Sequence, residues 1–201
     1  MRLAVSDMDI CSRIRPDYLA QHADLLRNAK AVVLDANIPE KSIRWLAENC
    51  EAPLFADPVS VTKSARLKDV IGRLHTLKPN RLEAGLLSGI PVRSDGDLGA
   101  AADALLARGL RRVFISLGSE GVYAAERGEH LLVPCCPARV RATTGAGDAF
   151  MAGLVCSHLL GHSLEEAART ASAAAAVSVE SSAAVNPGLS FRSLSEKLRT
   201  R

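Results

Sequence analysis

The chain has 201 residues, of which 48% are hydrophobic and 23% are charged, and its formal net charge is +3. This composition is typical of a folded globular protein and argues against a disordered chain. The weak net charge and the 3% of aromatic residues argue against a nucleic-acid-binding surface. No apolar run approaches the ~18 residues of a membrane span.

The five cysteines contain no C-x-x-C pair, which favours reduced thiols over a disulfide framework or a zinc ribbon. We therefore expect one domain over residues 1–201, in the cytoplasm, with no nucleic-acid or membrane partner.

Segments with strand and helix patterns alternate along the chain. Strands are predicted over residues 31–38, 53–58, 75–79, 112–117, 121–126 and 130–135. Helices are predicted over residues 39–50, 63–73, 80–88, 97–108, 146–160, 164–180 and 191–199. Such alternation predicts an α/β fold, with a mostly parallel sheet covered by helices on both faces.

Several of the predicted strands end in a polar residue just before a loop. These residues are Asp35, Asn37, Asp57, Asn80 and Ser116. In an open α/β sheet, ligands bind outside the carboxyl ends of the strands. We therefore expect these side chains to line one shared rim.

The strongest local motif is Thr-Thr-Gly-Ala-Gly-Asp, which ends at Asp148 and opens a predicted helix. The free N–H groups and the dipole at a helix start bind anions. A carboxylate beside them could take a proton from an alcohol while the amides hold a phosphoryl group. A purely structural role also fits, with Gly145 as the N-cap and Asp148 complementing the helix dipole.

Asn80 and Glu83 stand three residues apart at the start of another predicted helix. This spacing is typical of a capping box, which satisfies two backbone N–H groups. The functional alternative puts the amide and the carboxylate near Mg²⁺ bound to a phosphate, since Mg²⁺ prefers oxygen ligands.

A third motif, Ser-Leu-Gly-Ser-Glu-Gly, follows the predicted strand over residues 112–117. Its residues Ser116, Gly118 and Gly121 could contact nucleotide phosphates through a hydroxyl and bare backbone. A simple turn into the next strand is the alternative.

In this order, the three motifs resemble those of the ribokinase-like, or PfkB, family of sugar and nucleoside kinases. The resemblance implies ATP and Mg²⁺ as cofactors and assigns Asp148 as the base for the acceptor hydroxyl. It implies an anion hole from the backbone of Gly145, Ala146 and Gly147. It implies nucleotide and metal contacts from Asn80, Glu83, Ser116, Gly118, Gly121, Thr144 and, at the adenine, Asn186.

Residues 17–22, 55–60 and 75–83 resemble the bacterial pseudouridine kinases within this family. The resemblance implies transfer of a phosphoryl group from ATP to the 5′-hydroxyl of pseudouridine. Two alternatives stay open. One is a kinase for another nucleoside or a pentose, and the other is a protein that binds nucleotides without catalysis.

The family pattern begins with a segment that has no counterpart here, which carries the first strands, most of the lid and a sugar-binding Asp. We therefore expect an N-terminally truncated, ATP-handling portion of a kinase, whose bared sheet edge favours a homo-oligomer. Ala142 stands where the signature commonly has Asp or Asn, which weakens the case for a monovalent cation site.

Overall fold

The computed structural model describes residues 7–199, and its centre is a six-stranded sheet in the order β1-β2-β3-β4-β5-β6. The first four strands are parallel, and β5 and β6 are antiparallel to their neighbours. The strands are β1 (Val32–Asp35), β2 (Leu54–Asp57), β3 (Thr76–Leu77), β4 (Arg112–Ser116), β5 (Val122–Glu126) and β6 (Glu129–Val133). The predicted α/β fold with a mostly parallel sheet is confirmed.

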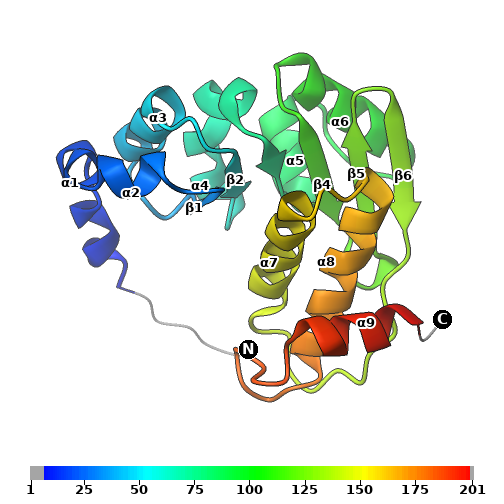
Figure 1. Cartoon of the computed structure of the whole chain (residues 1–201). Coiled ribbons are helices and arrows are strands. Elements are labelled where there is room, and N and C mark those ends of the chain that lie inside the picture. The colour runs from blue at the N-terminus through cyan, green and yellow to red at the C-terminus, as the bar shows by residue number, and fades with distance from the viewer. Residues whose placement is uncertain (1–6, 200–201) are drawn as a thin grey trace.

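Helices connect the strands and cover the sheet (Figure 1). They are η1 (Asp9–Arg13), α1 (Pro16–Gln21), α2 (Ala23–Arg27), α3 (Glu40–Asn49), α4 (Val61–Ser64), η2 (Ala65–Arg73), α5 (Arg81–Ser88), α6 (Gly96–Ala107), η3 (Gly118–Glu120), α7 (Ala146–Leu159), α8 (Leu164–Val179) and α9 (Phe191–Arg199). Helices α7 and α8 pack side by side, and α9 crosses one end of α8 (Figure 1).

The sheet separates two hydrophobic clusters because successive side chains of a strand point to opposite faces. On one face, Leu34, Ile115 and their neighbours pack with α3, η2, α5 and α6. On the other, Phe55 and Phe114 pack with α7 and α8. A Cβ on Gly153 would lie 2.6 Å from the Cα of Ala171, so this glycine lets α7 approach α8 closely.

The predicted cover on both faces is incomplete at β1, which pairs only with β2 among the described strands. Val33 is in register with Phe55 and therefore faces the α7 side of the sheet. Val33 is 53% exposed, because the strand that α7 chiefly contacts is β2. Among the described residues, β1 is therefore an edge strand with the apolar Val33 exposed on it.

Residues 63–73 also differ from the single α-helix that we predicted. The segment divides into the last residues of α4 and the 3₁₀-helix η2. The three-residue turn of a 3₁₀-helix aligns side chains three apart, and it keeps Leu67 and Val70 buried on the same side.

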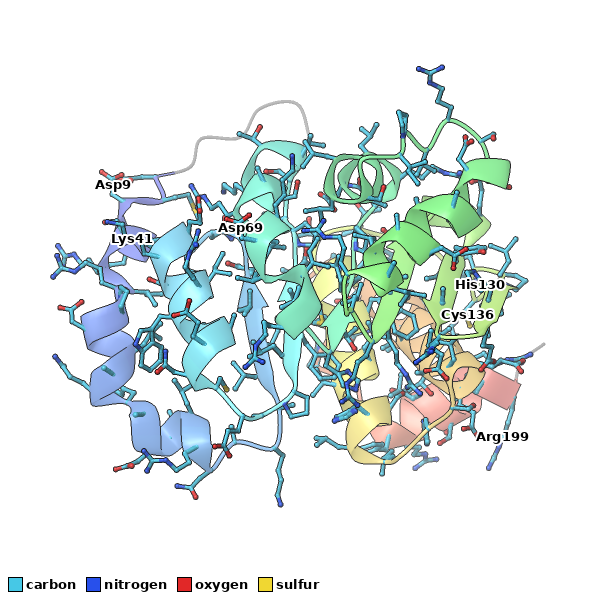
Figure 2. All side chains as sticks on the ribbon, turned by 90° about the horizontal axis from the view of Figure 1, so that it is seen from above. Asp9, Lys41, Asp69, His130, Cys136 and Arg199 are labelled. Atoms are coloured by element: carbon cyan, nitrogen blue, oxygen red, sulfur yellow. The ribbon has the colours of Figure 1, made fainter. Side chains whose placement is uncertain are left out.

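Figure 2 shows Asp9 of η1 and Lys41 of α3 at one end of the molecule, and His130 of β6 and Cys136, which follows β6, at the other end. Among residues 7–199, no helix is long and apolar enough to cross a membrane.

Candidate active site

A cleft of about 940 Å³ opens at the carboxyl ends of the parallel strands. It is lined by all five polar residues predicted to share a rim, which are Asp35, Asn37, Asp57, Asn80 and Ser116. Its other polar lining residues are Lys78, Glu83 and Asp148. Apolar side chains from α1, α2 and β1 line the rest, including Leu19, Leu26 and Val33.

The start of α7 forms one wall of this cleft. Gly145 is the N-cap, with a left-handed φ of +84°, and its backbone contacts the loop after α8. Asp148 lies in the first turn of α7, is exposed, and lines the cleft. Among the described residues, the N–H groups of Gly147 and Asp148 have no hydrogen-bond partner. The N–H of Ala146, which was predicted to belong to the anion hole, instead donates to the Thr143 carbonyl at 3.3 Å because it closes the turn before α7. This wall therefore offers free amide donors and the positive end of a helix dipole beside a carboxylate.

The opposite wall is the start of α5, where Asn80 and Glu83 form a capping box. The side chain of Asn80 accepts a hydrogen bond from the Glu83 N–H at 2.9 Å, and Glu83 Oε2 accepts one from the Asn80 N–H at 2.9 Å. The capping box predicted for this motif is confirmed. Burial raises the pKa of the Glu83 carboxyl, and the nearby Asp57 carboxylate raises it further.

Oxygen donors on this wall fit Mg²⁺, which usually binds proteins through one or two carboxylates together with substrate phosphates. Glu83 and Asn80 both line the cleft. Across the part of the chain that the structure describes, no group of three or more His, Cys, Asp or Glu side chains could hold a metal by itself. A metal here would therefore need oxygen ligands from a phosphate as well as from the protein.

Lys78 also lines the cleft, and the sequence analysis assigned it no role. Its Nζ is 2.9 Å from Asp57 Oδ2, and its side chain is 10% exposed. The available signal was its position at the end of a predicted strand, and in the structure it directly follows β3. The partner Asp57 is 21 positions earlier in the numbering, so the sequence did not reveal the pair.

Seven of the predicted site residues do not line this cleft: Gly118, Gly121, Thr144, Gly145, Ala146, Gly147 and Asn186. Gly118 begins η3 and Gly121 follows it, and both have positive φ angles. The side chain of Asn186 has a structural hydrogen bond, in which its Nδ2 donates to the Val177 carbonyl at 2.6 Å. Thr144 is exposed in the loop before α7. Their contacts with a nucleotide stay predictions.

The sequence of this chain matches a known family model along most of its length. Residues 10–190 match the model described as pfkB family carbohydrate kinase. The chain belongs to this family. The PfkB relatives include the pseudouridine kinase of Escherichia coli K12, which is 38% identical over 193 residues. That match covers 95% of this chain and 62% of the relative, so the chain spans less than two thirds of that enzyme.

Solved structures agree with the family assignment. A carbohydrate kinase from Agrobacterium tumefaciens superposes with a TM-score of 0.81 and 30% identity, over 98% of this chain and 64% of that one. The ribokinase of Arabidopsis thaliana, solved with ribose and ATP, superposes with a TM-score of 0.75 and 26% identity. That match covers 90% of this chain and 59% of the ribokinase.

Proposed function

We propose that this PfkB chain is the nucleotide-handling part of an ATP-dependent kinase that phosphorylates the 5′-hydroxyl of pseudouridine. The observation that carries the proposal is the arrangement of the cleft. The Asp148 carboxylate at the start of α7 lines the same cleft as Asn80 and Glu83 at the start of α5, and the free N–H groups of Gly147 and Asp148 lie at that helix start. Phosphoryl transfer needs little beyond such positioning and the stabilisation of charge.

In the proposed reaction, Asp148 accepts the proton of the acceptor hydroxyl as its oxygen attacks the terminal phosphorus of ATP. A new O–P bond forms, and the bond between that phosphorus and the bridging oxygen breaks. The electron pair of that bond leaves with ADP. The free N–H of Gly147 stabilises the negative charge on the transferred group, within the turn that the backbones of Gly145 and Ala146 form. Mg²⁺, held by phosphate oxygens with Glu83 and Asn80, would neutralise phosphate charge.

The nucleoside specificity is supported by the 38% identity with the pseudouridine kinase. Asp35 and Asn37 supply polar groups to the same cleft, beside apolar side chains that suit the face of a base. Another nucleoside or a pentose is the alternative acceptor.

We also propose that residues 1–201 act as one domain.

The test is release of ADP from Mg·ATP by the purified chain with pseudouridine, uridine or ribose, with the phosphorylated product identified by mass spectrometry. Stimulation by pseudouridine, with formation of its 5′-phosphate, is the expected result. Stimulation by uridine or ribose alone would overturn the substrate assignment and keep the kinase. Nucleotide binding without transfer to any acceptor would instead favour a non-catalytic nucleotide-binding role for this chain.

A further inference from the structure

The charge distribution of the cleft makes Lys78 unusual. Of the described residues that line the cleft, four are acidic: Asp35, Asp57, Glu83 and Asp148. Lys78 is the one lysine, arginine or histidine among them. A negatively charged phosphate would therefore meet a wall that repels it, except at the N-terminus of α7 and at this ammonium.

Burial of Lys78 requires a compensating partner, because moving an ammonium out of water is costly. The residue is 8% exposed, and Asp57 Oδ2 lies 2.9 Å from its Nζ. An ammonium has three N–H donors. Within residues 7–199, Asp57 is the only ion-pair partner of Nζ, and the Glu83 carboxylate attracts the ammonium from a longer distance, so two donors remain for a ligand in the cleft.

Asp57 is itself held in place on its other side. Its Oδ1 accepts a hydrogen bond from the Val59 N–H at 2.9 Å. Val59 has a φ of +65°, a strained value for a β-branched residue. Such strain persists where the surroundings fix the conformation, and it is common at functional sites. The carboxylate is therefore fixed by the turn after β2 and in turn fixes the ammonium.

The ammonium of Lys78 lies next to the start of α7. A Cβ on Gly147 would be 3.6 Å from Lys78 Nζ, so the glycine leaves the space beside the ammonium open. The N–H of Gly147 is one of the free donors of that helix. Two kinds of donor, an ammonium and a free backbone amide, thus lie close to one another at the start of α7.

We propose that Lys78, positioned by Asp57, binds the terminal phosphoryl group of the nucleotide together with the N–H groups at the start of α7. This inference rests on the proposed kinase function and adds a residue to it. Lys78 would contact the transferred group itself, and Asp57 would act as a positioning residue. The structural alternative is an ion pair that only joins the ends of β2 and β3.

Nucleotide binding separates the two roles. Isothermal titration with a non-hydrolysable ATP analogue and with ADP, both with Mg²⁺, compares the wild type with Lys78→Met and Lys78→Arg. Lys78→Met keeps most of the apolar stem and removes the charge. We expect it to weaken analogue binding by about 10- to 100-fold, the effect of one charge-assisted hydrogen bond. ADP lacks the terminal phosphoryl group, so its affinity should change less than about threefold, and Lys78→Arg should restore part of the analogue affinity.

Lys68→Met is the matched control, because Lys68 is exposed and does not line the cleft. It should leave both affinities unchanged. Asp57→Asn should weaken binding of the ATP analogue more than binding of ADP. It should also lower kcat with little change in KM for the acceptor. An ion pair with only a structural role would not separate these quantities. Asp57→Asn also serves as the second variant if Lys78→Met does not fold.

Equal losses for both nucleotides, or no loss, in folded Lys78→Met would overturn this inference and leave the kinase proposal intact. A wild-type chain that binds neither nucleotide would overturn both.

Discussion

The backbones of Gly145 and Ala184 are packed so closely that any side chain at position 145 would overlap the carbonyl oxygen of Ala184. Gly145 also has a φ of +84°, which L side chains rarely adopt. The loop after α8 therefore fixes the turn from which α7 starts, next to the free N–H groups of Gly147 and Asp148. This packing explains why the Gly-Ala-Gly run starts with a glycine.

Gly145→Ala should lower the free energy of unfolding by more than about 2 kcal/mol, from the left-handed φ together with the overlap. Gly128→Ala is the matched control, since Gly128 has a φ of +83° and nothing within 4 Å of its Cβ position. Gly128→Ala should lower the free energy of unfolding by only about 1 kcal/mol, because alanine is strained at a left-handed φ. Urea denaturation of both variants checks the difference, and equal destabilisation would contradict close packing at Gly145.

Gly147→Ala should leave the stability of the protein intact and lower its activity. Gly147 has no left-handed φ, and the added Cβ would lie 3.6 Å from Lys78 Nζ, an ordinary contact. The variant should fold with unchanged or slightly higher stability, because Ala is a better helix former than Gly. The methyl group would occupy the proposed phosphoryl space, so the rate of ADP release should fall at least ~10-fold. Thermal melting and the rate assay together test this, and full activity would place the phosphoryl group elsewhere.

Glu83→Gln separates capping from metal binding, because glutamine also completes a capping box. The fold should persist, and the Mg²⁺ concentration that gives half-maximal activity should rise several-fold. Glu166→Gln is the control, since Glu166 forms the same kind of box with Ser163 at the start of α8, outside the cleft. Unchanged Mg²⁺ dependence in Glu83→Gln would leave Glu83 with the capping role alone.

We expect the protein to lose stability in mild acid because His75 has a lowered pKa. Burial, then the nearby His158, Arg112 and Arg111, lower the pKa of His75 from 6.5 to about 4. The unfolded chain therefore binds a proton between pH 6.5 and 4 that the folded protein does not. The stabilisation is present above pH 6.5 and falls as the pH drops toward 4, by about 2–3 kcal/mol for this residue.

His75→Asn should flatten this part of the stability profile, because asparagine keeps a polar atom near the Thr76 hydroxyl but does not titrate. Denaturation midpoints at pH 7 and pH 5 measure the change. His22→Asn, at an exposed histidine, is the control and should leave the profile as in the wild type. A His75→Asn profile as steep as that of the wild type would contradict the assignment.

Much of the fold was predictable because local patterns agree with the final structure. The apolar β-branched run at 31–38 contains β1, and the Asn80 and Gly145 signals mark the starts of α5 and α7. The helical segments over residues 9–27 were not predicted. They depend on long-range contacts, such as the hydrogen bond of 2.5 Å from Ser42 Oγ to the Ile14 carbonyl.

The site was predictable only in part, for a similar reason. Residues of one motif, such as Asn80 and Glu83, are neighbours along the chain and can be interpreted from the sequence. The relation of Asp57, Lys78 and Gly147 exists only once β2 lies beside β3 and α7 covers that end of the sheet. No local pattern encodes that juxtaposition, so the role of Lys78 needed the structure.

In the proposed reaction, Asp148 takes the proton of the acceptor alcohol during phosphoryl transfer. ADP release from Mg·ATP by the wild type and by Asp148→Asn, at saturating pseudouridine, tests this role. We expect the rate of the variant to be lower by ~10²- to 10⁴-fold, with nucleotide affinity nearly unchanged. An Asp148→Asn variant that releases ADP and forms the phosphorylated product at the wild-type rate would contradict it.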